Sequence, residues 1–274
     1  MTDTPGYIHG FDAAEQDRLV RQAEFLAPYF HAGFAFEGCR NALEIGCGVG
    51  AQMRILLRHF PKLHITGIDQ AQTQIERARL LLAPEIAAGR AVVQHAEGGR
   101  LPFPDNHFEA VYLIFVLEHV RAPQPLLAEA ARVLRPSGVL FAAEVFNQSL
   151  YLYPPAPHTE RYWRAFNDCQ RALGGDPNVG PRLANLALAA DLLVDTLDDV
   201  SFMLDARVQD PVARKRVVQY WRELMASGAA SLLAGDYIDT SILTGMAREL
   251  AEIEQNPDAL LLYSGRRLKA RKAR

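Results

Sequence analysis

The stretch NALEIGCGVGAQ, residues 41–52, decides the fold of this chain. A short apolar run leads into glycines at three alternate positions, Gly46, Gly48 and Gly50, which is typical of a strand followed by a tight turn beneath a ligand. Together with Ala51, the first two glycines also satisfy the dinucleotide pattern G-x-G-x-x-G/A. The loop therefore predicts a nucleotide-type ligand but does not choose its class.

Length and composition favour small-molecule chemistry. The chain has 274 residues, 22% of them charged, and a formal net charge of −3. It is long enough for a large core and is not built to coat nucleic acid or an anionic membrane. The first residues lack a basic segment followed by an apolar run, and no later window is apolar for the length of a membrane span. We expect a soluble, cytoplasmic protein with no membrane partner, and we leave a homodimer open.

The cysteines argue against a metal centre. Cys39, Cys47 and Cys169 are odd in number and contain no C-x-x-C pair. This pattern fits neither a disulfide framework nor a zinc site. We expect reduced, mostly buried thiols and no bound metal.

Strand-like and helix-like segments alternate along the middle of the chain. Continuous apolar strands separated by amphipathic helices predict an α/β fold with a parallel sheet covered on both faces. The expected strands are 41–46, 64–69, 91–96, 108–116 and 138–146, and the expected helices are 51–60, 71–83 and 123–134. The sequence RPSG, residues 135–138, predicts a turn before the last of these strands.

Segments on either side of this core predict a cap and a lid. Asp12 and Glu15 resemble an N-cap with its reciprocal partner, so residues 1–35 are expected to form a cap helix before a core at 36–146. After Phe146 a proline cluster and further helices predict a lid at 147–257, interleaved with a late strand near 199–208. Such helices are expected over the carboxyl edge of the sheet, where ligands bind. Residues 258–274 are expected to form the last strand and a solvated basic tail.

Acidic residues at strand ends discriminate between the ligand classes. Asp69 lies about 20 positions after the loop, as a dinucleotide site requires. Glu44, two residues before Gly46, would repel a pyrophosphate but can face an ammonium group. Glu97 is a further acidic residue at the end of the third strand. It precedes a turn bracketed by prolines, and a dinucleotide-binding fold has no evident need for that turn.

Five ordered motifs resemble those of class I S-adenosylmethionine-dependent methyltransferases. They are LEIGCGVG at 43–50, GID at 67–69, AEGGRLPFPDNHFEAV at 96–111, VLEHV at 116–120 and RVLRPSGVLF at 132–141. Within that superfamily the chain is most similar to small-molecule enzymes related to the ubiquinone-biosynthesis C-methyltransferases. The resemblance implies a Rossmann-like fold and S-adenosylmethionine as cofactor.

The resemblance also implies roles for individual residues around the cofactor. Glu44 would hold the methionine ammonium, Asp69 the ribose hydroxyls and Glu97 the adenine amine. This chain departs from the family pattern at Glu97, where Asp is usual, and at Gln70, where an apolar residue usually lines the adenine. The further implied cofactor contacts are Gln22, Gly46, Gly48, Gln70, Gln74, Gly98 and Ile114.

The acceptor side is less defined. His119 is a candidate general base at the sheet edge, and Tyr7 is a candidate substrate contact in the cap. Helix capping and helix packing are the competing roles for these two residues. Aromatic and imidazole groups in the lid predict an aromatic or apolar acceptor, or alternatively the lid's own core: Tyr151, Tyr153, His158, Tyr162 and Trp163.

The function that follows is methyl transfer to a small-molecule acceptor, in secondary metabolism. One alternative is an isomerase or cyclase that retains the cofactor on the same fold. A tRNA or rRNA methyltransferase is another alternative, but the chain has no accessory basic domain, so nucleic acid is not an expected partner. The acceptor and the methylated atom are not encoded in these motifs.

Overall fold

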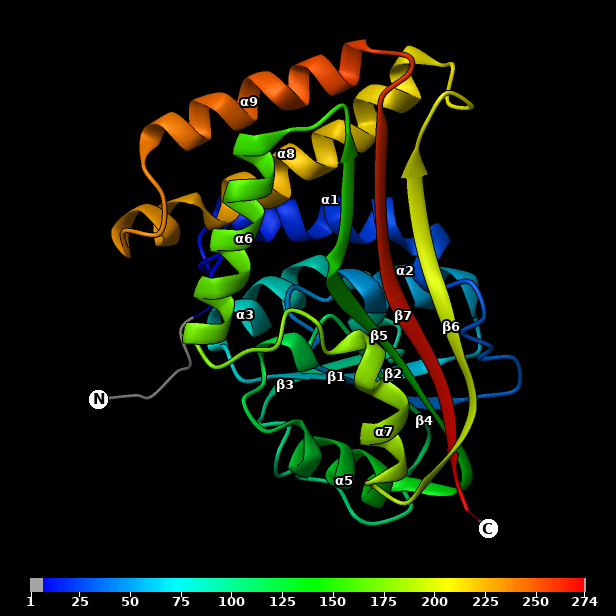
Figure 1. The fold of residues 1–274 in the computed structure, drawn as a ribbon. Helices are drawn as coiled ribbons and strands as arrows, with labels where there is room; N and C mark the ends of the chain where they lie inside the picture. The colour runs from blue at the N-terminus through cyan, green and yellow to red at the C-terminus, as the bar shows by residue number, and fades with distance from the viewer. Residues whose placement is uncertain (1–6, 274) are drawn as a thin grey trace.

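A computed structural model describes residues 7–273 and contains one seven-stranded sheet. The strand order is β3-β2-β1-β4-β5-β7-β6, with β1 to β5 parallel and β7 antiparallel to both β5 and β6 (Figure 1). The strands are β1 (Asn41–Ile45), β2 (His64–Asp69), β3 (Ala91–His95), β4 (Phe108–Ile114), β5 (Leu134–Tyr153), β6 (Leu192–Leu204) and β7 (Leu260–Lys272). The predicted Rossmann-like sheet is confirmed.

Helices cover both faces of the sheet, because successive side chains of each strand point to opposite sides. In β4, Tyr112 and Ile114 join the larger apolar core, whereas Val111 and Leu113 join the core on the other face. The helices around the sheet are α1 (Ala13–Phe30), α2 (Ala51–His59), α3 (Gln72–Leu81), α4 (Ala83–Ala87), α5 (Pro123–Val133) and α7 (Leu183–Leu188), with short 3₁₀ turns η1 (Leu117–His119) and η2 (Gly180–Arg182).

The predicted cap helix is present as α1. The carboxylate of Asp12 accepts a hydrogen bond from the backbone N–H of Glu15 at 2.9 Å, as the N-cap pattern predicts. The reciprocal half is not formed, because both carboxylate oxygens of Glu15 instead pair with the guanidinium of Arg18, each at 2.6 Å. Residues 1–6 of the expected cap lie outside the described part of the chain.

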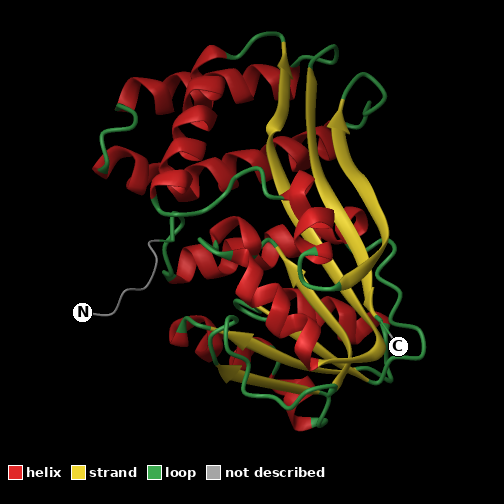
Figure 2. Ribbon diagram, turned by 60° about the horizontal axis from the view of Figure 1, so that its bottom comes forward, coloured by secondary structure: helices red, strands yellow, loops and turns green. Residues whose placement is uncertain are grey.

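The boundary expected after Phe146 falls inside a strand. β5 is 20 residues long and runs on to Tyr153, paired with β7 from Val139 onward with a register shift between Phe146 and Tyr151. Three helices, α6 (Pro157–Ala172), α8 (Pro211–Ala234) and α9 (Thr240–Gln255), gather beside the extended ends of β5, β6 and β7. Figure 2 shows these long strands reaching from the sheet into the helical lid. The lid is therefore carried on the sheet itself.

Two further expectations are corrected. RPSG belongs to the start of β5 and not to a separate turn, although Ser137 adopts a positive φ of 63° there. The basic tail is not a solvated end: up to Lys272 it forms β7, and its arginines pair with aspartates of β6. The ion pairs are Arg266 with Asp199, Arg267 with Asp198 and Arg271 with Asp195.

None of the helices within residues 7–273 combines the length and apolarity needed to cross a bilayer.

Candidate functional site

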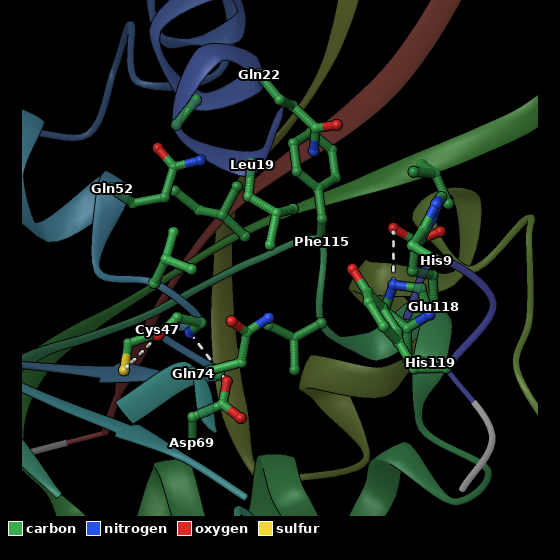
Figure 3. A pocket seen from close by; sticks show the side chains of 18 of the residues that line it. His9, Leu19, Gln22, Cys47, Gln52, Asp69, Gln74, Phe115, Glu118 and His119 are labelled. Carbon is green, nitrogen blue, oxygen red and sulfur yellow. Dashed lines mark hydrogen bonds and ion pairs between the residues drawn. The ribbon is translucent and has the colours of Figure 1, made fainter. Parts of the chain in front are cut away.

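A cavity of about 260 Å³ lies at the carboxyl ends of the strands, beneath α1 and the lid. Figure 3 shows its two ends. Asp69, Gln74 and Cys47 lie at one end, and His9, Glu118 and His119 lie at the other, with Gln22 and Phe115 between them. We call these the strand-acid end and the imidazole end.

Asp69 organises the strand-acid end. One carboxylate oxygen accepts the backbone N–H of Gly48 at 2.9 Å, and the other accepts that of Ala71 at 2.8 Å. Burial raises the pKa of Asp69, and the two N–H donors oppose that shift. Each oxygen retains a free lone pair, so the carboxylate can accept two further hydroxyl donors, as a ribose offers.

The three loop glycines have different structural roles. All have positive φ, 72° at Gly46, 51° at Gly48 and 77° at Gly50. A Cβ on Gly48 would meet nothing within 4 Å, so the space above it is open for a ligand. A Cβ on Gly46 would come within 2.6 Å of Val116, and one on Gly50 within 2.7 Å of Leu82. Gly50 thus serves packing.

Glu44 is a buried acid facing the cavity. It is 1% exposed, and one carboxylate oxygen accepts the hydroxyl of Tyr112 at 2.8 Å. Burial raises its pKa well above 4.5, and the charge of Asp69 raises it further. A cation beside Glu44 would favour its ionised form, so this pair of acids fits an ammonium and opposes a pyrophosphate.

The remaining predicted cofactor contacts divide into two groups. Gln22, Gln70, Gln74, Gly98 and Ile114 all line the cavity. Glu97 does not line it, and its side chain is exposed, so the structure does not bring it to the other two acids. Gln74 is 3% exposed and accepts a hydrogen bond from Gln16 of α1 at 3.2 Å.

The imidazole end brings together the two predicted acceptor-side residues and a third residue, His9, for which the sequence predicts no role. The rings of Tyr7 and His119 are 5.0 Å apart, and that of His9 lies 5.2 Å from Tyr7 and 6.3 Å from His119. Burial and nearby Glu15 raise the pKa of Tyr7, so its phenol stays protonated near neutral pH. Tyr7 can therefore donate a hydrogen bond but is not a base.

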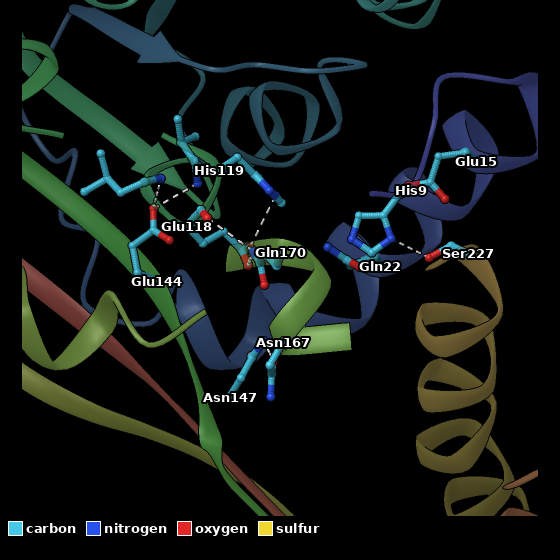
Figure 4. A network of polar contacts seen from close by, with 12 residues as sticks. His9, Glu15, Gln22, Glu118, His119, Glu144, Asn147, Asn167, Gln170 and Ser227 are labelled. Carbon is cyan, nitrogen blue, oxygen red and sulfur yellow. Dashed lines mark hydrogen bonds and ion pairs between the residues drawn. The ribbon is translucent and has the colours of Figure 1, made fainter. Parts of the chain in front are cut away.

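Glu144 holds the turn that carries His119. One oxygen accepts the backbone N–H groups of Val116 and Leu117 at 2.9 and 2.7 Å, and its second oxygen has no partner among the described residues. Burial and the neighbouring Glu118 raise the pKa of Glu144 to about 8. Glu118 in turn accepts the side-chain amide of Gln170 at 2.8 Å, which ties the turn to lid helix α6 (Figure 4).

Most of the lid aromatic and imidazole groups expected near the acceptor do not line the cavity. Trp163 lines the cavity and stacks on Phe166 with ring centres 5.1 Å apart. Tyr162 is buried in the lid core, and His158 pairs with Glu249 at 2.7 Å. Tyr151 and Tyr153 are exposed on β5. The helical pattern could not show this division, because it depends on how α6 packs.

Comparison with known proteins identifies the core. Residues 43–142 match the methyltransferase domain family. These residues form a class I methyltransferase domain. The chain is 30% identical over 149 residues to an O-methyltransferase, resE, of Aspergillus sclerotiorum, covering 53% of this chain and 56% of that protein. It is 32% identical over 175 residues to demethylmenaquinone methyltransferase of Tropheryma whipplei, covering 60% and 64%. The matched part of the chain thus spans less than two thirds of the length of each of these methyltransferases.

Solved structures agree on the fold of the methyltransferase domain and its lid. A protein of Galdieria sulphuraria with a provisional description as a sarcosine dimethylglycine methyltransferase superposes with a TM-score of 0.57 at 18% identity. The superposition covers 97% of this chain and 93% of that one. The [4+2]-cyclase SpnF superposes with a TM-score of 0.54 at 21% identity, covering 96% and 84%. At these identities the likeness is one of fold.

Proposed function

We propose that the protein transfers a methyl group from S-adenosylmethionine to a small-molecule acceptor. The observation that carries the proposal is one continuous cavity that joins the strand-acid end of a methyltransferase domain to the imidazole end beneath the lid. A cofactor site and an acceptor site must meet in this way for a group to pass between them.

The residues of the strand-acid end fit this cofactor. Asp69 has two oxygens free to accept ribose hydroxyls, the space above Gly48 is open, and Glu44 is a buried carboxyl suited to an ammonium. We assign Gln22, Gln74, Gly98 and Ile114 to the walls of the same site. Bound there, the cofactor supplies an electrophilic methyl group already activated by its sulfonium charge.

The protein then contributes to catalysis by positioning the acceptor against the methyl group and by excluding water. Apolar and aromatic side chains form the upper wall, among them Phe115, Trp163 and Phe166. They favour an aromatic or apolar acceptor, consistent with secondary metabolism. Pairing of the β7 arginines with β6 aspartates weakens the case for tRNA or rRNA as substrate. A cytoplasmic location and a homodimer stay predictions of the sequence.

Two measurements test the proposal. Calorimetry should detect binding of S-adenosylhomocysteine and none of NAD; the reverse result would overturn it. Methyl-tritiated S-adenosylmethionine, offered with a panel of phenols, amines and enolisable ketones, should label at least one acceptor. A product whose mass equals that of its substrate would instead indicate the isomerase or cyclase alternative.

A further inference from the structure

His9 and Ser227 form a contact that links the segment before α1 to lid helix α8. Nδ1 of His9 lies 2.6 Å from the hydroxyl oxygen of Ser227 (Figure 4). The same hydroxyl lies 2.7 Å from the backbone carbonyl of Leu224. A carbonyl only accepts, so the single hydroxyl proton of Ser227 is committed to Leu224. The hydrogen bond to His9 must then be donated by Nδ1.

This arrangement determines the tautomer of His9. The groups facing the ring are Tyr7, Arg18 of α1, His119 of η1 and Phe166 of α6. Burial lowers the pKa of His9 well below 6.5, and Arg18 and His119 lower it further, so the ring is neutral near neutral pH. A neutral imidazole has one N–H, and Nδ1 holds it, so Nε2 carries a free lone pair. His9 lines the cavity, and no described group bonds to its Nε2.

We propose that His9, held in the Nδ1–H tautomer by Ser227, is a catalytic residue whose Nε2 accepts the O–H or N–H proton of the methyl acceptor. This inference rests on the proposed function. The new bond joins the acceptor atom to the methyl carbon, the carbon–sulfur bond breaks with its electron pair on sulfur, and the acceptor proton passes to Nε2. The acceptor atom becomes strongly acidic as its new bond forms, so a weakly basic imidazole suffices. Ser227 is a positioning residue.

His119 is placed less well for this step. Its Nε2 lies 3.6 Å from a carboxylate oxygen of Glu118, and a nearby carboxylate favours a proton on that nitrogen, which would then have no free lone pair. Among the described residues, no carboxylate contacts Nε2 of His9. The hydrogen bond of the His9 ring is made through Nδ1. The structure therefore ranks His9 ahead of His119 as the base.

The first test needs no turnover. Long-range ¹H–¹⁵N spectra of protein labelled with ¹⁵N-histidine should show that His9 is protonated at Nδ1 and unprotonated at Nε2 at pH 7. The His9 signals are assigned by their absence in His9→Asn. Ser227→Ala should lose this preference. Ser231→Ala is the matched control, because Ser231 also ties α8 to the segment before α1, through Ile8 O at 2.8 Å, but does not contact His9. A proton on Nε2 in the wild type would overturn the inference.

The second test uses the acceptors labelled in the panel. His9→Asn keeps a donor toward Ser227 but has no atom at Nε2, and should lower kcat by about 100-fold, as loss of a general base does. His9→Gln restores a hydrogen-bond acceptor near Nε2 that cannot take up a proton, so it should show a loss similar to that of His9→Asn, and full recovery of kcat would overturn the role of His9 as base. S-adenosylhomocysteine affinity should stay unchanged in both variants. Equal kcat in wild type and His9→Asn would overturn the inference; absence of labelling by the wild type would overturn the proposed function instead, and the tautomer would still be measured.

Discussion

The two ends of the cavity are built in different ways. The strand-acid end comes from a local stretch of chain, in which Asp69 bonds to backbone N–H groups within 21 residues of itself. The imidazole end joins residues far apart in the chain, such as His9 and Ser227, which are separated by 218 positions. The amino-acid sequence of the strand-acid end can vary little without loss of its hydrogen bonds to the backbone. The residues of the imidazole end can change when the sequence of the lid changes. The comparison shows how one cofactor site can serve different acceptors.

The largest effect that separates the two ends is expected from Asp69→Ala. The change removes the acceptor of two loop N–H groups and of the proposed ribose bonds, each worth about 1.5–3 kcal/mol for a charged partner. Affinity for S-adenosylhomocysteine should fall by at least about 100-fold in calorimetry. The tautomer of His9 should not change. Asp258→Asn, at an exposed aspartate, is the control; undiminished affinity in Asp69→Ala would remove the basis for the assigned cofactor site.

Gly46→Ala should disturb both ends at once. Its Cβ would press on Val116 at 2.6 Å, in the turn that leads to His119, and its φ of 72° adds strain. We expect the free energy of unfolding to fall by about 2–3 kcal/mol, combining the left-handed backbone penalty with overpacking.

Gly48→Ala is the matched variant for that experiment. Its φ is also positive, but its Cβ meets no protein atom within 4 Å. Its stability loss should be about 1 kcal/mol, from backbone strain alone. Denaturant unfolding measures both losses, and equal losses would contradict the packing difference between these two glycines.

Glu144→Gln should change how stability depends on pH. Burial raises the folded-state pKa of Glu144 from 4.5 to about 8, so the folded protein keeps a proton that the unfolded chain releases. The wild type therefore loses stability as pH rises from about 4.5 to about 8. Glutamine keeps the acceptor for Val116 and Leu117 but does not titrate. The difference between the two proteins in urea unfolding should grow from pH 5 to pH 8; a constant difference would show that Glu144 does not titrate in this range.

The smallest effect on activity is expected from His119→Asn. With His9 as the principal base, loss of His119 should lower kcat/KM by about 10-fold, or about 1.4 kcal/mol. Cofactor affinity should be unchanged, because His119 lies at the other end of the cavity. Steady-state rates with a labelled acceptor provide the measurement, and a loss larger than that of His9→Asn would reverse the order of the two imidazoles.

The sequence predicts the fold, and it indicates Asp69, Gly46 and Gly48, which line the cavity, for a physical reason. Parallel strands of the core are continuous apolar runs, and β2 has the bounds expected for it. Asp69 and the glycines act through backbone geometry at a strand end, which a short motif encodes. Glu97 follows the same logic but is exposed outside the cavity, because the position of its side chain depends on the loop after β3 and not on the strand.

The imidazole end was only partly predictable. Tyr7 and His119, which the sequence indicates, line the cavity, but the partners of His9 and Glu144 come from distant elements. A signal for Glu144 was present, since an acid inside the otherwise apolar run of β5 needs buried hydrogen-bond donors. Nothing local marks Ser227, which lies in the middle of a long helix. The lid boundary was misplaced because polar and proline residues after Phe146 conceal the continuation of the strand.

That continuation has a mechanical consequence. A lid joined by loops can swing as a body about a hinge, but here β5, β6 and β7 enter the lid as a hydrogen-bonded ladder, with Tyr151 opposite Leu262 and Met203 opposite the same residue. A swing would have to bend or break that ladder. We therefore expect exchange of substrate and product to depend on small local movements, such as release of His9 from Ser227 where α8 meets the segment before α1. Variants that loosen this contact should alter release rates without altering the fold.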